Sequence, residues 1–112
     1  MQFTILSIES SCDETAVSIV SAFKDPQNNV TKINILAHEV ESQNESHAPF
    51  GGVVPEVAAR DHLAKIYDIT NTALNKANIS ITDLNSIAVT MGPGLIGALM
   101  VGVLFARGLA LS

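Results

Sequence analysis

Near the start of the chain, six consecutive polar or small residues, SSCDET at residues 10–15, stand between two apolar segments. The apolar segments, residues 3–8 and 16–20, have the pattern of β-strands. The two adjacent carboxylates repel each other and lose hydration between paired strands, which is unfavourable unless something binds them. A tight hairpin would use Asn-Gly or Asp-Gly here. The segment therefore predicts a loop that binds a phosphate group and its metal ion.

A glycine-rich motif, GPGLIG at residues 92–97, follows an expected strand and opens an expected helix. Its spacing matches the G-x-G-x-x-G of dinucleotide-binding proteins. That interpretation is disfavoured, because the fingerprint belongs to the first strand–helix unit and Pro93 stiffens the turn. Two alternatives remain. Either Gly92 and Gly94 let an anion approach the helix N-terminus, or the glycines only permit tight packing of the helix.

The histidines do not form a metal-binding pattern. His38 lies in an expected strand, His47 in a loop and His62 on a helix, without an H-x-x-x-H or H-E-x-x-H pair. We therefore expect no complete metal site in these residues. We expect His62 to be a helix-surface or core-edge residue that bonds to the backbone. Cys12 has no base near it in the sequence, so we interpret it as a small loop residue and not as a nucleophile.

Composition limits the class of protein. The 112 residues are 47% hydrophobic, enough for the core of one domain. Eleven acidic and six basic residues give a net charge of −5, which argues against a nucleic-acid-binding surface. The single cysteine fits a reducing compartment. The uncharged stretch 95–106 is too short to span a bilayer and no signal peptide is evident. We expect a cytoplasmic protein without a membrane segment.

The apolar pattern predicts three strands, a helix, a fourth strand and a second helix. We expect strands at 2–9, 15–23, 32–42 and 85–91, helices at 55–77 and 94–111, a turn at 24–31 and a long loop at 43–54. Pro55 suits the first turn of a helix, and Asn78 is a plausible helix stop. The β-β-β-α-β-α order is that of the start of a ribonuclease-H-like lobe, and the fold class is α/β.

The second expected helix carries a small residue at every fourth position: Gly94, Ala98, Gly102, Ala106 and Ala110. Such a row forms a shallow groove into which another helix can pack. Nearly all other residues of this helix are apolar, and an exposed apolar patch usually marks an interface. We expect the helices at 55–77 and 94–111 to bind a partner subunit. The alternative is that further segments of the same protein cover them.

Three motifs together match one protein family in order and spacing. They are SSCDET at 10–15, HAPFGGVVPE followed by RDHL within residues 47–63, and MGPGLIGAL at 91–99. The chain resembles the N-terminal part of the TsaD/Gcp-type tRNA N6-adenosine threonylcarbamoyltransferases of bacteria and organelles, formerly labelled O-sialoglycoprotein endopeptidases. The resemblance covers essentially all of residues 1–112. It implies an incomplete actin-like (ASKHA) ATPase lobe, with a second lobe elsewhere in the protein.

The resemblance also implies an activity. The whole protein would transfer threonylcarbamoyl from threonylcarbamoyl-AMP to N6 of adenosine 37 in tRNA. It would use ATP or threonylcarbamoyl-AMP and one divalent metal ion, iron or zinc, with metal ligands beyond Ser112. Residues 1–112 alone are then expected to be inactive. The expected site residues are Asp13 and Glu14 as catalytic groups, and Ser10, Ser11, Gly92 and Gly94 as nucleotide or phosphate ligands.

The implied partners are a paralogous TsaB-type subunit, a small TsaE-type P-loop ATPase, and tRNA bound through other parts of the protein or complex. Two alternative functions stay open. The chain could be a non-catalytic dimerisation module like the paralogous subunit, or a metalloprotease, as the old label says. The SCDET loop argues against the first, because the paralogue lacks it. No motif with a base and a metal supports the second.

Overall fold

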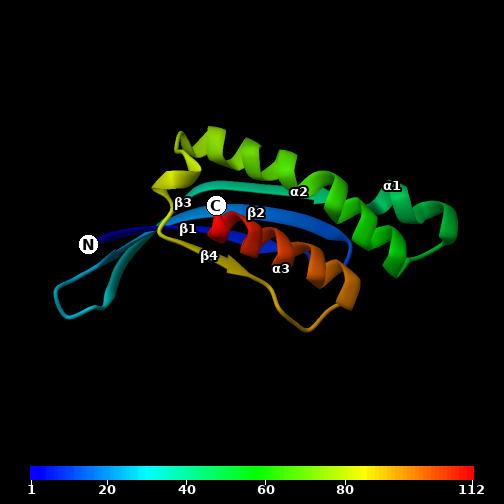
Figure 1. Ribbon diagram of the computed structural model, residues 1–112, viewed down its shortest axis with the longest axis horizontal. Helices are drawn as coiled ribbons and strands as arrows, with labels where there is room; N and C mark the ends of the chain where they lie inside the picture. The colour runs from blue at the N-terminus through cyan, green and yellow to red at the C-terminus, as the bar shows by residue number, and fades with distance from the viewer.

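The computed structural model describes residues 1–112 as one four-stranded sheet with two long helices on one face (Figure 1). The strands are β1 (Gln2–Glu9), β2 (Glu14–Lys24), β3 (Val30–Ser42) and β4 (Ser86–Val89), and the long helices are α2 (Pro55–Ala77) and α3 (Ile96–Leu111). Short helices α1 (Asn44–His47), η1 (Ala48–Phe50) and η2 (Ile81–Asp83) lie in the connections. The strand order is β3-β2-β1-β4, with β1 antiparallel to β2 and parallel to β4. The predicted α/β class and element order are confirmed.

The core lies between the sheet and the two long helices. Alternate residues of β1 and β2 point into it, so Leu6 pairs with Ile19 and Ile8 with Val17 in register. On α2, the buried apolar residues recur at helical spacing and meet these strands. They are Ile66, Ile69, Ala73 and Leu74. The packing fixes the N-terminal ends of α2 and α3 close to the end of β1 (Figure 1).

Most predicted boundaries agree with the structure. α2 begins at Pro55 as predicted and ends before Asn78, which adopts the left-handed conformation at φ 56°. β3 starts two residues earlier than predicted, because β2 and β3 form one long hairpin with a short turn (Figure 1). α3 begins at Ile96 instead of 94, since Leu95 is still extended. The predicted loop 43–54 contains α1 and η1, so it is more ordered than expected.

The middle of the small-residue row on α3 faces the sheet of the same chain, whereas Gly94 precedes the helix and Ala110 is exposed. Ala98, Gly102 and Ala106 are buried. A β-carbon at Gly102 would lie 2.5 Å from the Ser10 hydroxyl oxygen. The expectation that this row forms a groove for a partner is therefore wrong, because the small residues let α3 approach β1 closely. Neither α3 nor any other helix has both the length and the apolar character needed to cross a membrane.

Candidate functional site

The first loop, residues 10–13, is held in place by hydrogen bonds to three of its own consecutive carbonyl oxygens. Those of residues 11, 12 and 13 accept hydrogen bonds, in order, from the Leu95 amide at 2.8 Å, the His62 ring at 2.9 Å and the Gln43 amide at 3.0 Å. Leu95 precedes α3, His62 lies on α2, and Gln43 follows β3. The three motifs that stood out in the sequence therefore meet at one loop.

This anchoring determines which groups of the loop face outward. The C=O and N–H groups of a trans peptide unit point in opposite directions. Because the carbonyls of Ser11 and Cys12 point toward the body of the protein, the amides of Cys12 and Asp13 face away from it. The Glu14 side chain is exposed and that of Asp13 is half-buried. Outward amides beside carboxylates suit a phosphate and its cation.

Ser10 and Gly94, both predicted to contact a phosphate, instead join the loop to α3. The Ser10 hydroxyl is buried and donates to the Ala98 carbonyl at 2.8 Å. A β-carbon at Gly94 would lie 2.6 Å from the Ser11 carbonyl oxygen, whereas Gly92 has open space around it. We therefore assign Ser10 and Gly94 to packing of the loop against α3. Ser11 and Gly92 stay predicted phosphate ligands.

His62 is more deeply placed than the sequence indicated. The predicted bond to the backbone is confirmed, but the ring is fully buried and not on the helix surface. Its second nitrogen, Nδ1, lies 2.7 Å from the Thr15 hydroxyl. Burial lowers the pKa of His62, and the hydrogen bond to Cys12 only partly offsets this. The ring is therefore neutral near pH 7 and serves as a fixed hydrogen-bonding group.

Cys12 is exposed at the tip of the loop. Partial desolvation raises the pKa of its thiol, the neighbouring Asp13 carboxylate raises it further, and the Asp13 backbone amide only partly opposes this. A raised pKa disfavours the thiolate, which is the nucleophilic form. This agrees with the interpretation of Cys12 as a small loop residue.

A buried amide–imidazole pair orders the segment after β3. Gln43 is fully buried; its Oε1 lies 2.7 Å from His47 Nε2, and its Nε2 donates to the Ala58 carbonyl at 3.2 Å. His47 Nδ1 accepts from the Val54 amide at 3.0 Å. These bonds fold residues 44–54 against the start of α2. The role of Gln43 was not predicted, because a single polar residue at the end of a strand was its only signal in the sequence.

A hollow of about 240 Å³ lies between the first loop and this segment. Its lining residues are Asp13, Asn44, His47, Ala48, Gly51, Gly52 and Val53. Asp13 contributes the only carboxylate, so a ligand or cation in this space would meet the first loop directly. The hollow and the outward amides together form the candidate site.

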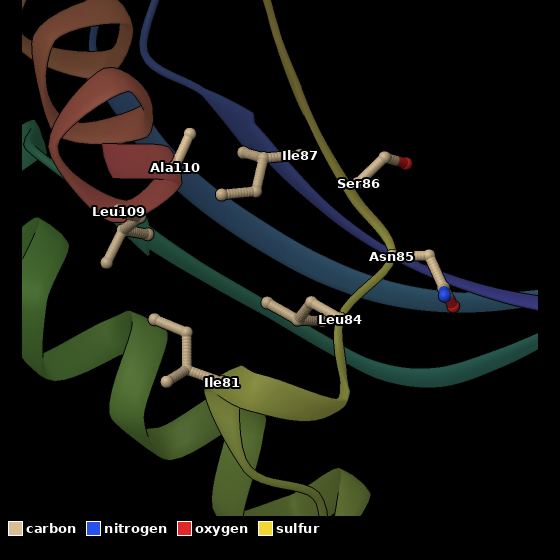
Figure 2. Close-up of a pocket in the computed structure, with 7 residues that line it drawn as sticks. All are labelled: Ile81, Leu84, Asn85, Ser86, Ile87, Leu109 and Ala110. Carbon is tan, nitrogen blue, oxygen red and sulfur yellow. The ribbon is translucent and has the colours of Figure 1, made fainter. Parts of the chain in front are cut away.

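Other parts of the chain carry less chemistry. A hollow of about 230 Å³ at the opposite end of the sheet is lined mainly by apolar side chains, among them Ile81, Leu84 and Leu109 (Figure 2). It has no titratable side chain. No group of three or more His, Cys, Asp or Glu residues comes together for a metal ion anywhere in residues 1–112.

Comparison with known proteins adds independent information. The family described as TsaD, tRNA N6-adenosine threonylcarbamoyltransferase, matches residues 34–112. Proteins named tRNA N6-adenosine threonylcarbamoyltransferase from Staphylococcus saprophyticus and Ehrlichia canis are 54% and 46% identical to 95% of this chain. One from Thermosipho africanus is 50% identical over 96%. The chain spans 27% to 29% of the length of these relatives.

A solved structure of YeaZ from Pseudomonas aeruginosa has a similar fold. The TM-score is 0.64 at 17% sequence identity, and the match covers 97% of this chain and 39% of that one. At such low identity the similarity concerns the fold alone. It confirms that the sheet with two helices is an arrangement found in a solved protein of this fold type.

Proposed function

The chain belongs to the TsaD family of tRNA N6-adenosine threonylcarbamoyltransferases, and from this premise we propose that it supplies the phosphate-binding loop of such an enzyme. The whole protein would transfer threonylcarbamoyl from threonylcarbamoyl-AMP to N6 of adenosine 37 in tRNA. The observation that supports this most is that the other two motifs, through Leu95 and His62, bind the carbonyl oxygens of residues 11 and 12 in the first motif.

The chemistry of the transfer gives the loop a role. The N6 amine forms a bond to the carbamoyl carbon and releases one proton to solvent, and the bond from that carbon to the phosphate oxygen breaks. AMP leaves with additional negative charge on its phosphate. The outward amides of Cys12 and Asp13, with the Ser11 hydroxyl and Gly92 nearby in the fold, would stabilise that charge. Asp13 and Glu14 would act through a cation, because a carboxylate alone repels a phosphate.

The metal ion of the family is proposed to bind outside these residues. No suitable group of ligands forms within residues 1–112, so this chain does not fit a complete iron or zinc site. The net charge of −5 likewise indicates that tRNA is contacted by other parts of the protein or by partners. A tRNA substrate implies a cytoplasmic protein, with which the single free cysteine is consistent.

A TsaB-type partner is proposed for the outer side of α2 and α3. Large apolar side chains there are 53% to 79% exposed: Leu63, Tyr67, Ile96, Met100 and Leu104. Apolar surface of this kind usually marks an interface. We assign no surface to a TsaE-type ATPase.

The alternative functions have less support. A non-catalytic dimerisation module would need neither the SCDET loop nor its buried anchors, yet both are present. Relatives named as transferases are also 46% to 54% identical to this chain, which favours the transferase. The protease alternative has no support from the relatives described above, which are named as transferases.

A chimera tests the proposal. Residues 1–112 replace the equivalent segment of the Staphylococcus saprophyticus relative, which is 54% identical. The purified chimera is incubated with its partner proteins, threonylcarbamoyl-AMP and tRNA, and threonylcarbamoyladenosine is quantified by mass spectrometry of the nucleosides. The chimera is expected to form the product at a rate within about tenfold of the parent. A folded chimera without product, beside an active parent, would overturn the proposal.

A further inference from the structure

His62 is the only side chain among the three donors that hold the first loop. The carbonyls of Ser11 and Asp13 are held by backbone amides, which changes of side chain leave in place. The carbonyl of Cys12 is held by the imidazole of His62, from 50 positions away in the sequence. The orientation of the Cys12–Asp13 peptide therefore depends on one buried ring.

The partners of the ring define its tautomer. A carbonyl oxygen only accepts, so Nε2 carries the proton and donates to Cys12 at 2.9 Å. In the neutral ring Nδ1 is then an acceptor, and the Thr15 hydroxyl donates to it at 2.7 Å. His62 and Thr15 are both fully buried. The ring thus has both nitrogens engaged and one orientation.

We propose that His62, oriented by Thr15, is a positioning residue that keeps the Asp13 amide directed at the phosphate of the substrate. This inference rests on the proposed function. With the Cys12 carbonyl held toward α2, the Asp13 amide faces outward, and the Asp13 residue lines the hollow beside the loop. If this peptide rotated, a carbonyl oxygen would replace the amide and would repel the phosphate.

A histidine that only fills the core would have different effects. Its loss would reduce the fraction of folded enzyme, which lowers the apparent kcat and leaves KM unchanged. A misdirected amide weakens binding of the substrate that carries the phosphate and so raises the KM for that substrate. The KM for threonylcarbamoyl-AMP therefore separates positioning from structure.

The test uses the full-length chimera described above and a set of matched variants. His62→Leu removes both hydrogen bonds of the ring, whereas His62→Gln keeps an N–H donor that can reach Cys12. Thr15→Val removes only the hydroxyl that orients the ring. Thr70→Val is the control, because Thr70 is another buried hydroxyl of α2, bonded to the Ile66 carbonyl at 2.7 Å and outside the loop contacts.

We expect His62→Leu to raise the KM for threonylcarbamoyl-AMP about tenfold and Thr15→Val to raise it less. His62→Gln should restore most of the affinity, and Thr70→Val should leave KM unchanged. The KM for tRNA should be the same in all variants. An unchanged KM for threonylcarbamoyl-AMP in both His62→Leu and Thr15→Val would overturn the proposal. If His62→Leu does not fold, the KM of Thr15→Val for threonylcarbamoyl-AMP decides.

A folded but inactive unsubstituted chimera would contradict the proposed function and not the positioning role. The orientation of the peptide is then read from the 15N–1H resonance of the Asp13 amide in the folded chimera. We expect this resonance to shift in Thr15→Val and to stay in place in Thr70→Val. An unshifted resonance in Thr15→Val would overturn the positioning role.

Discussion

Gly94 approaches Ser11 so closely that a β-carbon at position 94 would lie 2.6 Å from the Ser11 carbonyl oxygen and 2.7 Å from its β-carbon. The amide of the next residue, Leu95, donates to the same carbonyl. The glycine-rich motif and the first loop are therefore one packed unit. Close backbone contact, and not a dinucleotide, explains the glycine at position 94.

Gly94→Ala should destabilise the chain by about 1–3 kcal/mol, because the atom that the methyl group meets is backbone and cannot turn aside. Gly92→Ala is the matched control, since nothing lies within 4 Å of a β-carbon there. The free energy of unfolding in urea measures both. Equal stability of the two variants would show that the two loops do not pack as described.

Gly102→Ala should also cost about 1–3 kcal/mol, since the new methyl group would meet the Ser10 hydroxyl. Adding Ser10→Ala should recover part of this loss, so the two changes should not be additive. Gly108→Ala, with open space around it in the same helix, should stabilise by up to about 1 kcal/mol. If the stability changes of Gly102→Ala and Ser10→Ala simply add in the double variant, α3 does not contact Ser10 as described.

Local signals were sufficient to predict several elements. Pro55 and Asn78 marked the two ends of α2 because each has a conformational preference that acts without tertiary contacts. The charged loop was recognised because adjacent carboxylates are unfavourable between strands, although it is shorter than predicted and Glu14 is already the first residue of β2. The contacts of His62 and Gln43 with that loop could not be predicted, because they arise only when α2 packs on the sheet.

The small-residue row of α3 shows a different limit. Its spacing correctly indicated close packing of a helix, but it did not indicate against what. Almost every residue of α3 is apolar, so no polar side shows which face points outward. Only the structure reveals that Ala98 and Ala106 face the sheet and that Met100 and Leu104 are exposed.

The free energy of unfolding should decrease as the pH falls below about 6.5. The pKa of His62 is lowered by burial; the hydrogen bond to Cys12 and the carboxylates of Asp61 and Glu9 oppose this, and Lys65 adds to it. Below pH 6.5 the unfolded chain binds a proton that the folded chain does not, which costs at most about 1.4 kcal/mol per pH unit. Above that pH the contribution is constant.

His62→Gln should remove this part of the pH dependence. Asp61 does not titrate in the same pH range. Burial would raise the pKa of Asp61, but hydrogen bonds from Lys65 and Ser46 leave it below the ordinary value. Its contribution to stability is present above about pH 4 and is lost only at lower pH. The free energy of unfolding in urea is measured between about pH 5 and 8 for the unsubstituted protein and for His62→Gln. Identical slopes in both proteins would mean that His62 titrates normally.

Met100→Glu should weaken association of the chimera with a TsaB-type subunit at least about tenfold, because it places a charge on the exposed apolar side of α3. The melting temperature should hardly change, since the side chain is exposed. Val30→Glu, exposed on the β2–β3 hairpin, is the control and should bind normally. Isothermal titration calorimetry measures the dissociation constant of each variant for the TsaB-type subunit. Unaltered binding of Met100→Glu would assign this face to other segments of the protein.

The transfer rate of Asp13→Asn in the chimera, measured with saturating threonylcarbamoyl-AMP and tRNA, tests the role of the first loop most directly. We predict that Asp13→Asn, like Glu14→Gln, lowers the rate about 10- to 1,000-fold, because a charge-stabilising contact is lost. The melting temperature should stay nearly unchanged. Asp68→Asn, an exposed carboxylate on α2, should leave the rate as it is. Unchanged turnover in both Asp13→Asn and Glu14→Gln would contradict the account and reduce the first loop to a solvated turn.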